Sequence, residues 1–182
     1  MEETHGRGLG GAVRRRRRAL DLTLAVLAER SGLSVPFLSQ IENERARPSI
    51  RSLQRIADGL QTTAVQLMAA AHDTGSSLHV VRAHDDAGLA ADTGVRPLVR
   101  GNRQMHALEF TGTQHADREF LHQNDELMYV ADGTAEVHAE GRTLVLDRGD
   151  TLYLTGGVRH RWRATSPDTR VLLVAVSDGG DL

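Results

Sequence analysis

The stretch from Gly32 to Asn43 constrains the fold more than any other part of the chain. Ser34 can cap a short helix, because its side-chain oxygen can accept hydrogen bonds from the free N–H groups of the first turn. Pro36 falls within that first turn, where its missing N–H has no cost. Leu38 and Ile41 are three residues apart and are expected on the buried side of the helix. The segment therefore predicts a short helix with an exposed polar face.

Four further helices are expected around this one in the first half of the chain. Thr23 is a second N-cap candidate, and Gly32 can supply the left-handed backbone that ends the preceding helix. Apolar residues recur at helical spacing in each segment. The expected helices cover about 9–20, 23–30, 34–43, 49–60 and 63–71. Five short helices with tight turns predict a compact helix-turn-helix domain over residues 9–71.

After a polar linker at 72–77, the hydrophobic period changes from that of a helix to that of a strand. Short strand-like segments follow, separated by turn sequences such as Asp132-Gly133. Tyr129 and Trp162 lie in such segments and are expected to have a packing role rather than a recognition role. The expected strands are 78–82, 105–110, 126–131, 134–139, 142–146, 151–154, 160–164 and 171–176, with a loop at 83–95. This pattern predicts a small antiparallel all-β barrel or sandwich over residues 78–178.

The amino-acid composition excludes some kinds of chemistry and indicates where a charged partner would bind. The chain contains no cysteine, which excludes disulfides, thiolate ligands and thiol nucleophiles. Residues 1–71 carry eleven Arg against seven acidic residues (+4), whereas residues 72–182 carry eleven Arg against seventeen acidic residues (−6). A polyanion is therefore expected to bind the first half. No apolar run is long enough to span a bilayer and no signal peptide is recognisable, so we expect a soluble cytoplasmic protein.

Residues 9–70 resemble a helix-turn-helix domain of the XRE class, which includes the phage repressors. The segments that match in order and spacing are 22–24, 27–32, 37–43 and 47–49. The resemblance implies that the third helix enters the major groove of double-stranded DNA. The predicted DNA-contacting residues are Thr23, Ser34, Val35, Pro36, Ser39, Gln40, Asn43, Arg45 and Arg47. The Gln40 amide suits adenine, because it can donate and accept together, whereas Asn43, Arg45 and Arg47 are expected on phosphates.

Three charged features of this half carry further expectations. The resemblance places Arg17 and Glu42 as a partly buried ion pair between the first and third helices. Glu44 stands just after the third helix, where relatives often have glycine, so we expect a left-handed residue whose carboxylate faces phosphate. The five side chains of Arg14–Arg18 cannot all point the same way on a helix. They therefore either form a solvated face or provide one or two contacts to phosphates.

Residues 118–164 resemble a cupin, which implies a jelly-roll β-barrel. The first family motif is matched by His122, Glu126 and Gly133, and the second by Gly149, Gly157 and His160. The resemblance implies that His122, Glu126 and His160 point inward as the facial set that holds Fe(II), Mn(II) or Zn(II).

The cupin motifs also depart from the family pattern. Phe120 stands where the first metal-binding histidine is expected, so a barrel that has lost its metal is an open alternative. The histidines without motif support, which are expected to line the pocket or the surface, are His106, His115 and His138.

Together the two resemblances imply a one-component transcription regulator. The helical half would bind an operator as a homodimer, and the barrel would hold a small-molecule effector. The alternative is an enzyme, because an iron-dependent epoxidase of hydroxyalkyl phosphonates resembles the same layout. That family uses a lysine from its helical half and tyrosines on an early barrel strand. This chain has no lysine, and residues 105–110 contain no tyrosine, so the sequence favours the regulator.

Overall fold

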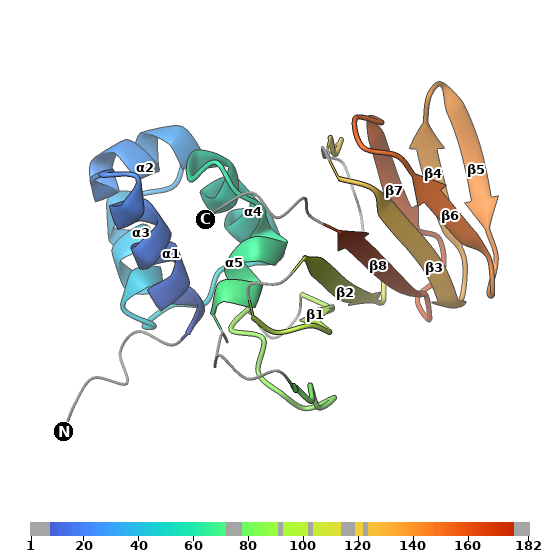
Figure 1. The fold of residues 1–182 in the computed structure, drawn as a ribbon, viewed down its shortest axis with the longest axis horizontal. Helices are drawn as coiled ribbons and strands as arrows, with labels where there is room; N and C mark the ends of the chain where they lie inside the picture. Colours follow the sequence, from blue (N-terminus) through green and yellow to red (C-terminus); the bar gives the residue numbers. More distant parts are fainter. Residues whose placement is uncertain are drawn as a thin grey trace. The chain divides into compact units, whose positions relative to one another are not determined.

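The computed structural model describes residues 8–71, 78–90, 93–101, 104–113, 119–121 and 124–176. The chain divides into two compact units. The first contains five helices and the second contains two antiparallel sheets (Figure 1). The predicted fold class, a helical domain followed by an all-β domain, is therefore confirmed. In the part of the chain that the structure describes, no helix is long and apolar enough to cross a membrane.

The helices start and stop close to the predicted positions. They are α1 (Leu9–Ala19), α2 (Leu24–Ser31), α3 (Val35–Glu42), α4 (Ile50–Gly59) and α5 (Ala64–Ala70). At the start of the last four, a side-chain hydroxyl accepts a hydrogen bond from the backbone N–H three residues ahead; the capping residues are Thr23, Ser34, Ser49 and Thr63. Gly32 ends α2 in the left-handed conformation, with φ of 62°. Local sequence therefore fixes the helix boundaries.

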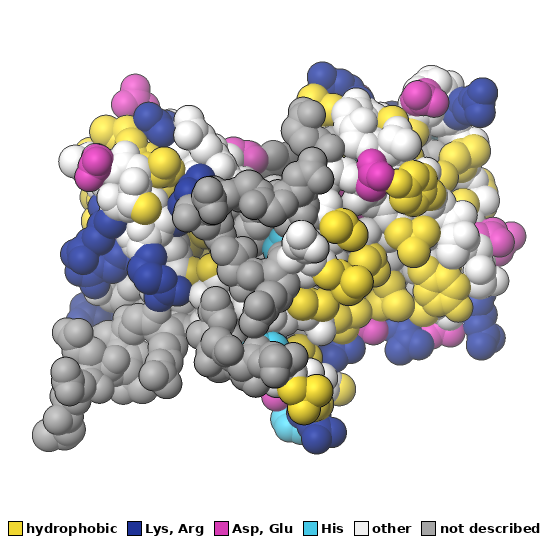
Figure 2. Space-filling model, viewed as in Figure 1, with side chains coloured by type: hydrophobic (Ala, Val, Ile, Leu, Met, Phe, Trp, Pro, Cys, Tyr) yellow, Lys and Arg dark blue, Asp and Glu magenta, His cyan; other side chains and the backbone are white. Residues whose placement is uncertain are grey.

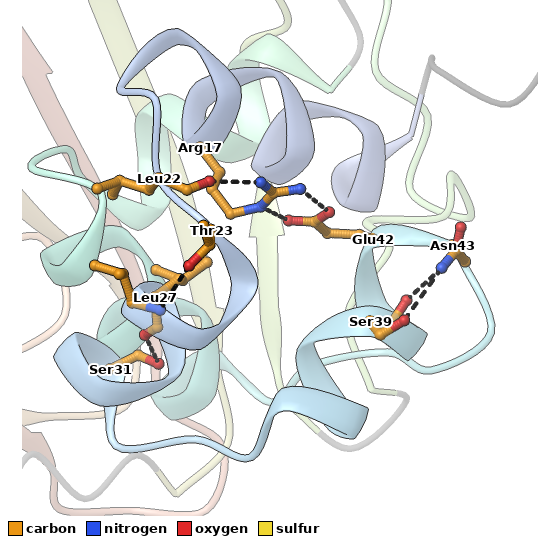
Figure 3. Close-up of polar contacts among 9 residues, drawn as sticks. Arg17, Leu22, Thr23, Leu27, Ser31, Ser39, Glu42 and Asn43 are labelled. Atoms are coloured by element: carbon orange, nitrogen blue, oxygen red, sulfur yellow. Dashed lines mark hydrogen bonds and ion pairs between the residues drawn. The ribbon is translucent and has the colours of Figure 1, made fainter.

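Helix α1 packs closely against α3, and an ion pair joins the two. A Cβ atom on Gly10 would lie 2.0 Å from the carbonyl oxygen of Ile41, so only glycine permits this approach. The Nε and Nη2 atoms of Arg17 donate to the Glu42 carboxylate at 2.6 and 2.8 Å, and its Nη1 donates to the Leu22 carbonyl (Figure 3). The side chains are 12% and 4% exposed, so the predicted, partly buried ion pair is confirmed.

Two further arginines of the 14–18 run also bind within the helical unit. Arg16 donates to the carbonyls of Leu60 and Gln61 just after α4, and Arg15 donates to the Ala70 carbonyl at the end of α5. A cation is favourable at these positions because the last carbonyls of a helix carry partial negative charge. Three arginines of the run therefore hold helices together rather than forming a solvated face.

The segment after the predicted linker differs from the sequence prediction. Residues 78–82 form no regular secondary structure, so the predicted strand is wrong. Leu78 and Val80 are exposed, because the alternating pattern has no neighbouring strand to bury it. Residues 78–90 instead belong to the helical unit, where Leu89 is buried and Ala90 N–H donates to the Pro48 carbonyl at 3.1 Å.

The second unit contains two antiparallel sheets that face each other (Figure 1). The five-stranded sheet has the order β1 (Val95–Pro97), β2 (Met105–Thr111), β8 (Arg170–Val176), β3 (Glu126–Asp132) and β6 (Thr151–Leu154). The three-stranded sheet has the order β5 (Arg142–Leu146), β4 (Ala135–Ala139) and β7 (His160–Ala164). Sequence analysis missed β1, whose three residues include a proline; its pairing with β2 makes it an edge strand.

An apolar core fills the space between the two sheets. Met128 and Val130 from one sheet contact Val137 and Trp162 from the other. Trp162 meets Phe110 edge to face, with ring centroids 5.1 Å apart, and its predicted packing role is confirmed. Tyr129 is 37% exposed, because its neighbours Met128 and Val130 face inward and strand alternation turns Tyr129 to the outer face of the sheet.

Candidate functional site

Helix α3 presents one exposed face and one buried face. Leu38 and Ile41 are buried against the other helices, whereas Val35, Pro36 and Gln40 are exposed and Ser39 is half-buried. Positions four apart share a helix face, so Val35 lies in line with Ser39 and Pro36 lies in line with Gln40, in two adjacent rows on the surface of α3. The predicted arrangement of α3, with a polar outer face over an apolar inner face, is therefore present.

Three other predicted DNA-contacting residues make hydrogen bonds at the ends of helices. The Thr23 and Ser34 hydroxyls accept from N–H groups of α2 and α3 at 3.2 and 3.3 Å. The Asn43 amide donates to the Ser39 carbonyl at 2.7 Å, which closes the end of α3 (Figure 3). All three residues are exposed on the unit that carries α3. A contact with DNA would thus add to a structural hydrogen bond that each one already makes.

The basic turn after α3 contains two exposed arginines in different situations. Arg45 is exposed at the surface. Arg47 forms a two-pronged ion pair with Asp86, in which Nη1 and Nη2 lie 2.9 and 2.5 Å from the two carboxylate oxygens. The two side chains are 57% and 58% exposed, so the pair is open to solvent. A phosphate that approaches the Arg47 Nη1 and Nη2 atoms therefore competes with the Asp86 carboxylate for them.

Asp86 is held in place by the segment around it. Its Oδ1 atom also accepts from the Gly88 N–H at 2.8 Å, and the neighbouring Leu89 is buried. Nearby, Asp85 pairs with Arg100 at 2.6 Å. Sequence analysis missed Asp86, because no local motif links an acid in a loop to an arginine 39 positions earlier.

Glu44 has the predicted left-handed conformation, with φ of 57°. Its Oε1 atom accepts from the Gly11 N–H at 3.2 Å, at the start of α1. A Cβ atom on Gly8 would lie 2.4 Å from the same oxygen, so the glycine-rich start of α1 makes room for this carboxylate. The positive end of the α1 dipole thus stabilises this carboxylate, and the expectation that it faces phosphate stays a prediction.

The described part of the barrel interior brings together two of the three predicted metal ligands. Glu126 begins β3 and His160 begins β7, and the His160 Nε2 atom lies 3.9 Å from a Glu126 carboxylate oxygen. Burial raises the pKa of Glu126, and the nearby His160 opposes that rise. The third predicted ligand, His122, lies outside the described residues, as does His115.

Hydrogen bonding orients the His160 ring. Its Nδ1 atom lies 3.1 Å from the Val158 carbonyl oxygen, which can only accept, so Nδ1 carries the proton and Nε2 faces Glu126. This is the arrangement in which imidazole Nε2 can bind a metal ion. The Phe120 ring, which replaces a family histidine, lies 5.9 Å from the His160 ring. The donors that the structure describes, Glu126 and His160, thus fit two positions of a metal site, and an apolar ring lies beside them.

A further histidine lines the same end of the barrel. His106 on β2 and Glu126 on β3 both pair with Ala175 of β8, so their side chains share one face of the sheet. His106 is buried on that inner face, and burial lowers its pKa, which favours the neutral ring. His138 instead lies on the outside of the other sheet, where it contacts Glu136 and Thr143.

Comparison with known families agrees with this architecture. Residues 13–67 match the family model described as helix-turn-helix, and residues 109–177 match the model described as cupin domain. The chain joins an XRE-type helix-turn-helix domain to a cupin domain. An uncharacterized HTH-type transcriptional regulator of Mycobacterium tuberculosis is 40% identical over 55 residues, which cover 30% of this chain and 39% of that relative.

Solved structures extend the similarity along the whole chain. An HTH_3 family transcriptional regulator from Vibrio cholerae aligns with 96% of this chain and 97% of its own, with 19% identity and a TM-score of 0.55. That similarity shows a shared two-domain fold. The iron(II) form of HppE aligns with 94% of this chain and 100% of its own, but its 18% identity and TM-score of 0.42 are too low to support an inference.

Proposed function

We propose that this HTH–cupin chain is a transcription regulator that binds double-stranded DNA through α3. The observation that carries the proposal is the exposed face of α3, which includes Gln40. A turn with the exposed side chains of Arg45 and Arg47 follows this helix directly. The net positive charge of residues 1–71 supports binding to a polyanion. Such a regulator works in the cytoplasm, where the chromosome lies.

The test compares two variants on the promoter DNA of the protein and on a random duplex. Gln40→Ala should relax base preference by about 1–3 kcal/mol, because a two-pronged contact to a base edge is lost. Arg45→Ala should weaken binding to both duplexes alike and lower the salt slope by about 1, because a phosphate contact is lost. Equal losses on both duplexes for Gln40→Ala would refute base recognition by α3. Failure of the wild-type protein to bind either duplex at moderate salt would refute DNA binding itself.

The cupin interior is the proposed effector site. His106, Glu126 and His160 line one end of the described interior, and the opposite end is filled by apolar side chains. A ligand bound among these polar groups would change DNA affinity only if it favours one arrangement of a homodimer over another. Compounds that raise the melting temperature of the wild-type chain, but not of a His106→Ala variant, should also shift its DNA affinity. Compounds that stabilise the barrel without any such shift would refute the coupling.

A divalent metal ion is a proposed occupant of the same interior. Glu126 and His160 would bind Fe, Mn or Zn together with His122, and the metal would supply a Lewis acid or open coordination positions. Elemental analysis of purified protein should find the ion in the wild type and in His138→Ala, but not in His160→Ala. Retention of stoichiometric metal by His160→Ala would refute this site.

A cupin metalloenzyme is the second candidate function, favoured by the buried Glu126–His160 pair. Stoichiometric iron in a protein that does not bind DNA would support the enzyme over the regulator. DNA binding without metal would support a regulator whose barrel is an effector pocket alone.

A further inference from the structure

The outer face of the five-stranded sheet carries a continuous apolar surface. Its exposed members, between 37% and 58% exposed, are Met105, Leu127, Tyr129, Tyr153 and Val176. Strand pairing places them together: Leu127 lies between Val174 and Tyr153, and Tyr129 lies beside Leu172. We call these seven residues the apolar sheet face, which Figure 2 shows as a yellow area over the strands. The face belongs to β2, β8, β3 and β6, so it lies within one unit.

The size of the apolar sheet face suits a protein interface. Taking about 150–250 Å² for a whole large side chain, the five exposed members leave on the order of 450 Å² of apolar surface in contact with water. Contiguous apolar patches of about 300–600 Å² on a single chain commonly have a binding role. A stable interface covers about 800 Å² on each partner and has an apolar, tyrosine-rich centre with a polar rim. The apolar sheet face can provide such a centre.

The rim of this face carries charged residues at both ends. At one end, Arg170 binds Asp132 at 3.0 Å, and Arg148 adds a 78% exposed guanidinium 3.7 Å from the same carboxylate. At the other end of β3, the exposed Asp125 accepts hydrogen bonds from the Tyr153 hydroxyl and the Gly156 N–H. A two-fold axis through the middle of the sheet would bring the Arg148 end of one copy opposite the Asp125 end of the other.

We propose that the apolar sheet face is the interface between two copies of this chain. The inference rests on the proposed function, because a DNA-reading module that covers one half-site gains from a two-fold pair. The second copy is the occupant that the size of the face supports, because about 450 Å² of apolar surface from each copy is the apolar share expected of an interface that covers about 800 Å² on each partner. A different protein on this face would leave the chain monomeric when it is pure.

The test is sedimentation equilibrium of the full chain in the absence of DNA. Wild type should be a dimer at micromolar concentration, and Leu127→Lys or Tyr153→Lys should each raise the dimer dissociation constant at least about 10-fold. Val145→Lys is the matched control, because Val145 is 63% exposed on the other sheet, and this variant should stay dimeric. A monomeric wild type, a dimer that survives both face substitutions, or equal weakening by Val145→Lys would each overturn the proposal. Circular dichroism establishes that each variant is folded.

Cross-linking tests the orientation of the two copies. The chain has no cysteine, so single thiols can be placed without background. Asp125→Cys and Arg148→Cys proteins mixed in equal amounts should cross-link through a short bismaleimide far more than either protein alone. Equal cross-linking in all three samples would overturn the two-fold arrangement. Because neither experiment contains DNA, a dimer that fails to bind DNA would refute only the proposed function, and a monomer that binds a half-site would refute only this interface.

Discussion

The ion pair between Arg47 and Asp86 leads to a quantitative prediction about DNA binding. In the free protein the guanidinium is bound by a carboxylate from the same unit, at 2.9 and 2.5 Å. When a phosphate takes that place, Asp86 loses its contact with the Arg47 guanidinium and lies near a polyanion. Replacing Asp86 by Asn keeps the shape of the side chain and removes its charge. The variant should therefore bind DNA more tightly than wild type, with no change in base preference.

The magnitude follows from the exposure of the pair. Because both side chains are more than half exposed, the pair contributes about 0.2–1 kcal/mol, which corresponds to roughly 1.5- to 5-fold in affinity for each DNA-binding head. The salt dependence should change as well. In wild type, the carboxylate released from Arg47 attracts a cation from solution, which offsets part of the counterion release from DNA. Removing it should steepen the slope of log K against log salt by up to about 0.9.

The assay is fluorescence anisotropy with a random duplex at several salt concentrations between about 50 and 200 mM. Glu29→Gln is the matched control, since Glu29 is an exposed acid on α2 and the change in net charge is the same. In an Arg47→Ala background, Asp86→Asn should have no effect beyond that of Glu29→Gln. Two results would each refute competition between Asp86 and phosphate for Arg47. One is that Asp86→Asn and Glu29→Gln give the same DNA affinity and the same slope of log K against log salt. The other is that the Asp86→Asn effect persists in the Arg47→Ala background.

Three further predictions concern the stability of the fold. Glu42→Gln should lower the free energy of unfolding by about 3 kcal/mol in urea titrations, because it leaves the Arg17 guanidinium poorly paired; a loss below about 1 kcal/mol would contradict this role. Gly10→Ala should destabilise the protein by about 1–3 kcal/mol through contact with the Ile41 carbonyl, although helix propensity alone predicts about 1 kcal/mol of stabilisation, so a rise in stability would disprove the close approach. Arginine and histidine partners lower the pKa of Glu136 from 4.5 to about 2, so it stabilises the fold above its unfolded pKa. The stability difference between wild type and Glu136→Gln should thus shrink from pH 4.5 toward pH 2 in acid unfolding; a constant difference would refute the assignment.

Helix boundaries followed from sequence because their causes are local. The hydroxyls of Ser34 and Thr63 find their partners three residues away, and Gly32 ends a helix through its own backbone. The strand prediction at 78–82 failed for the opposite reason. Alternating apolar residues indicate a strand only where a neighbouring strand completes the sheet, and the short β1 formed instead at Val95–Pro97, beside β2.

The candidate site also combines features that follow from local sequence with features that depend on tertiary packing. Sequence alone placed Gln40 on an exposed helix face and paired Arg17 with Glu42, through helical periodicity and family resemblance. It could not give the direction of the Glu44 side chain, which depends on where the start of α1 lies. Nor could it show that Asp86 reaches Arg47, since that contact depends on how a loop folds back onto the helices.

By itself, then, the sequence determined the five helices, seven of the eight strands that the structure describes, the two domains and the exposed face of α3, because spacing and caps act over a few residues. Only the tertiary structure decided which charges meet and which apolar residues remain at the surface. Asp86 bound to Arg47 and Tyr129 turned to solvent are both outcomes of long-range packing. A charge or a tyrosine has the same local pattern whether it is buried, paired or exposed, and its role is set by the partner that the fold brings to it.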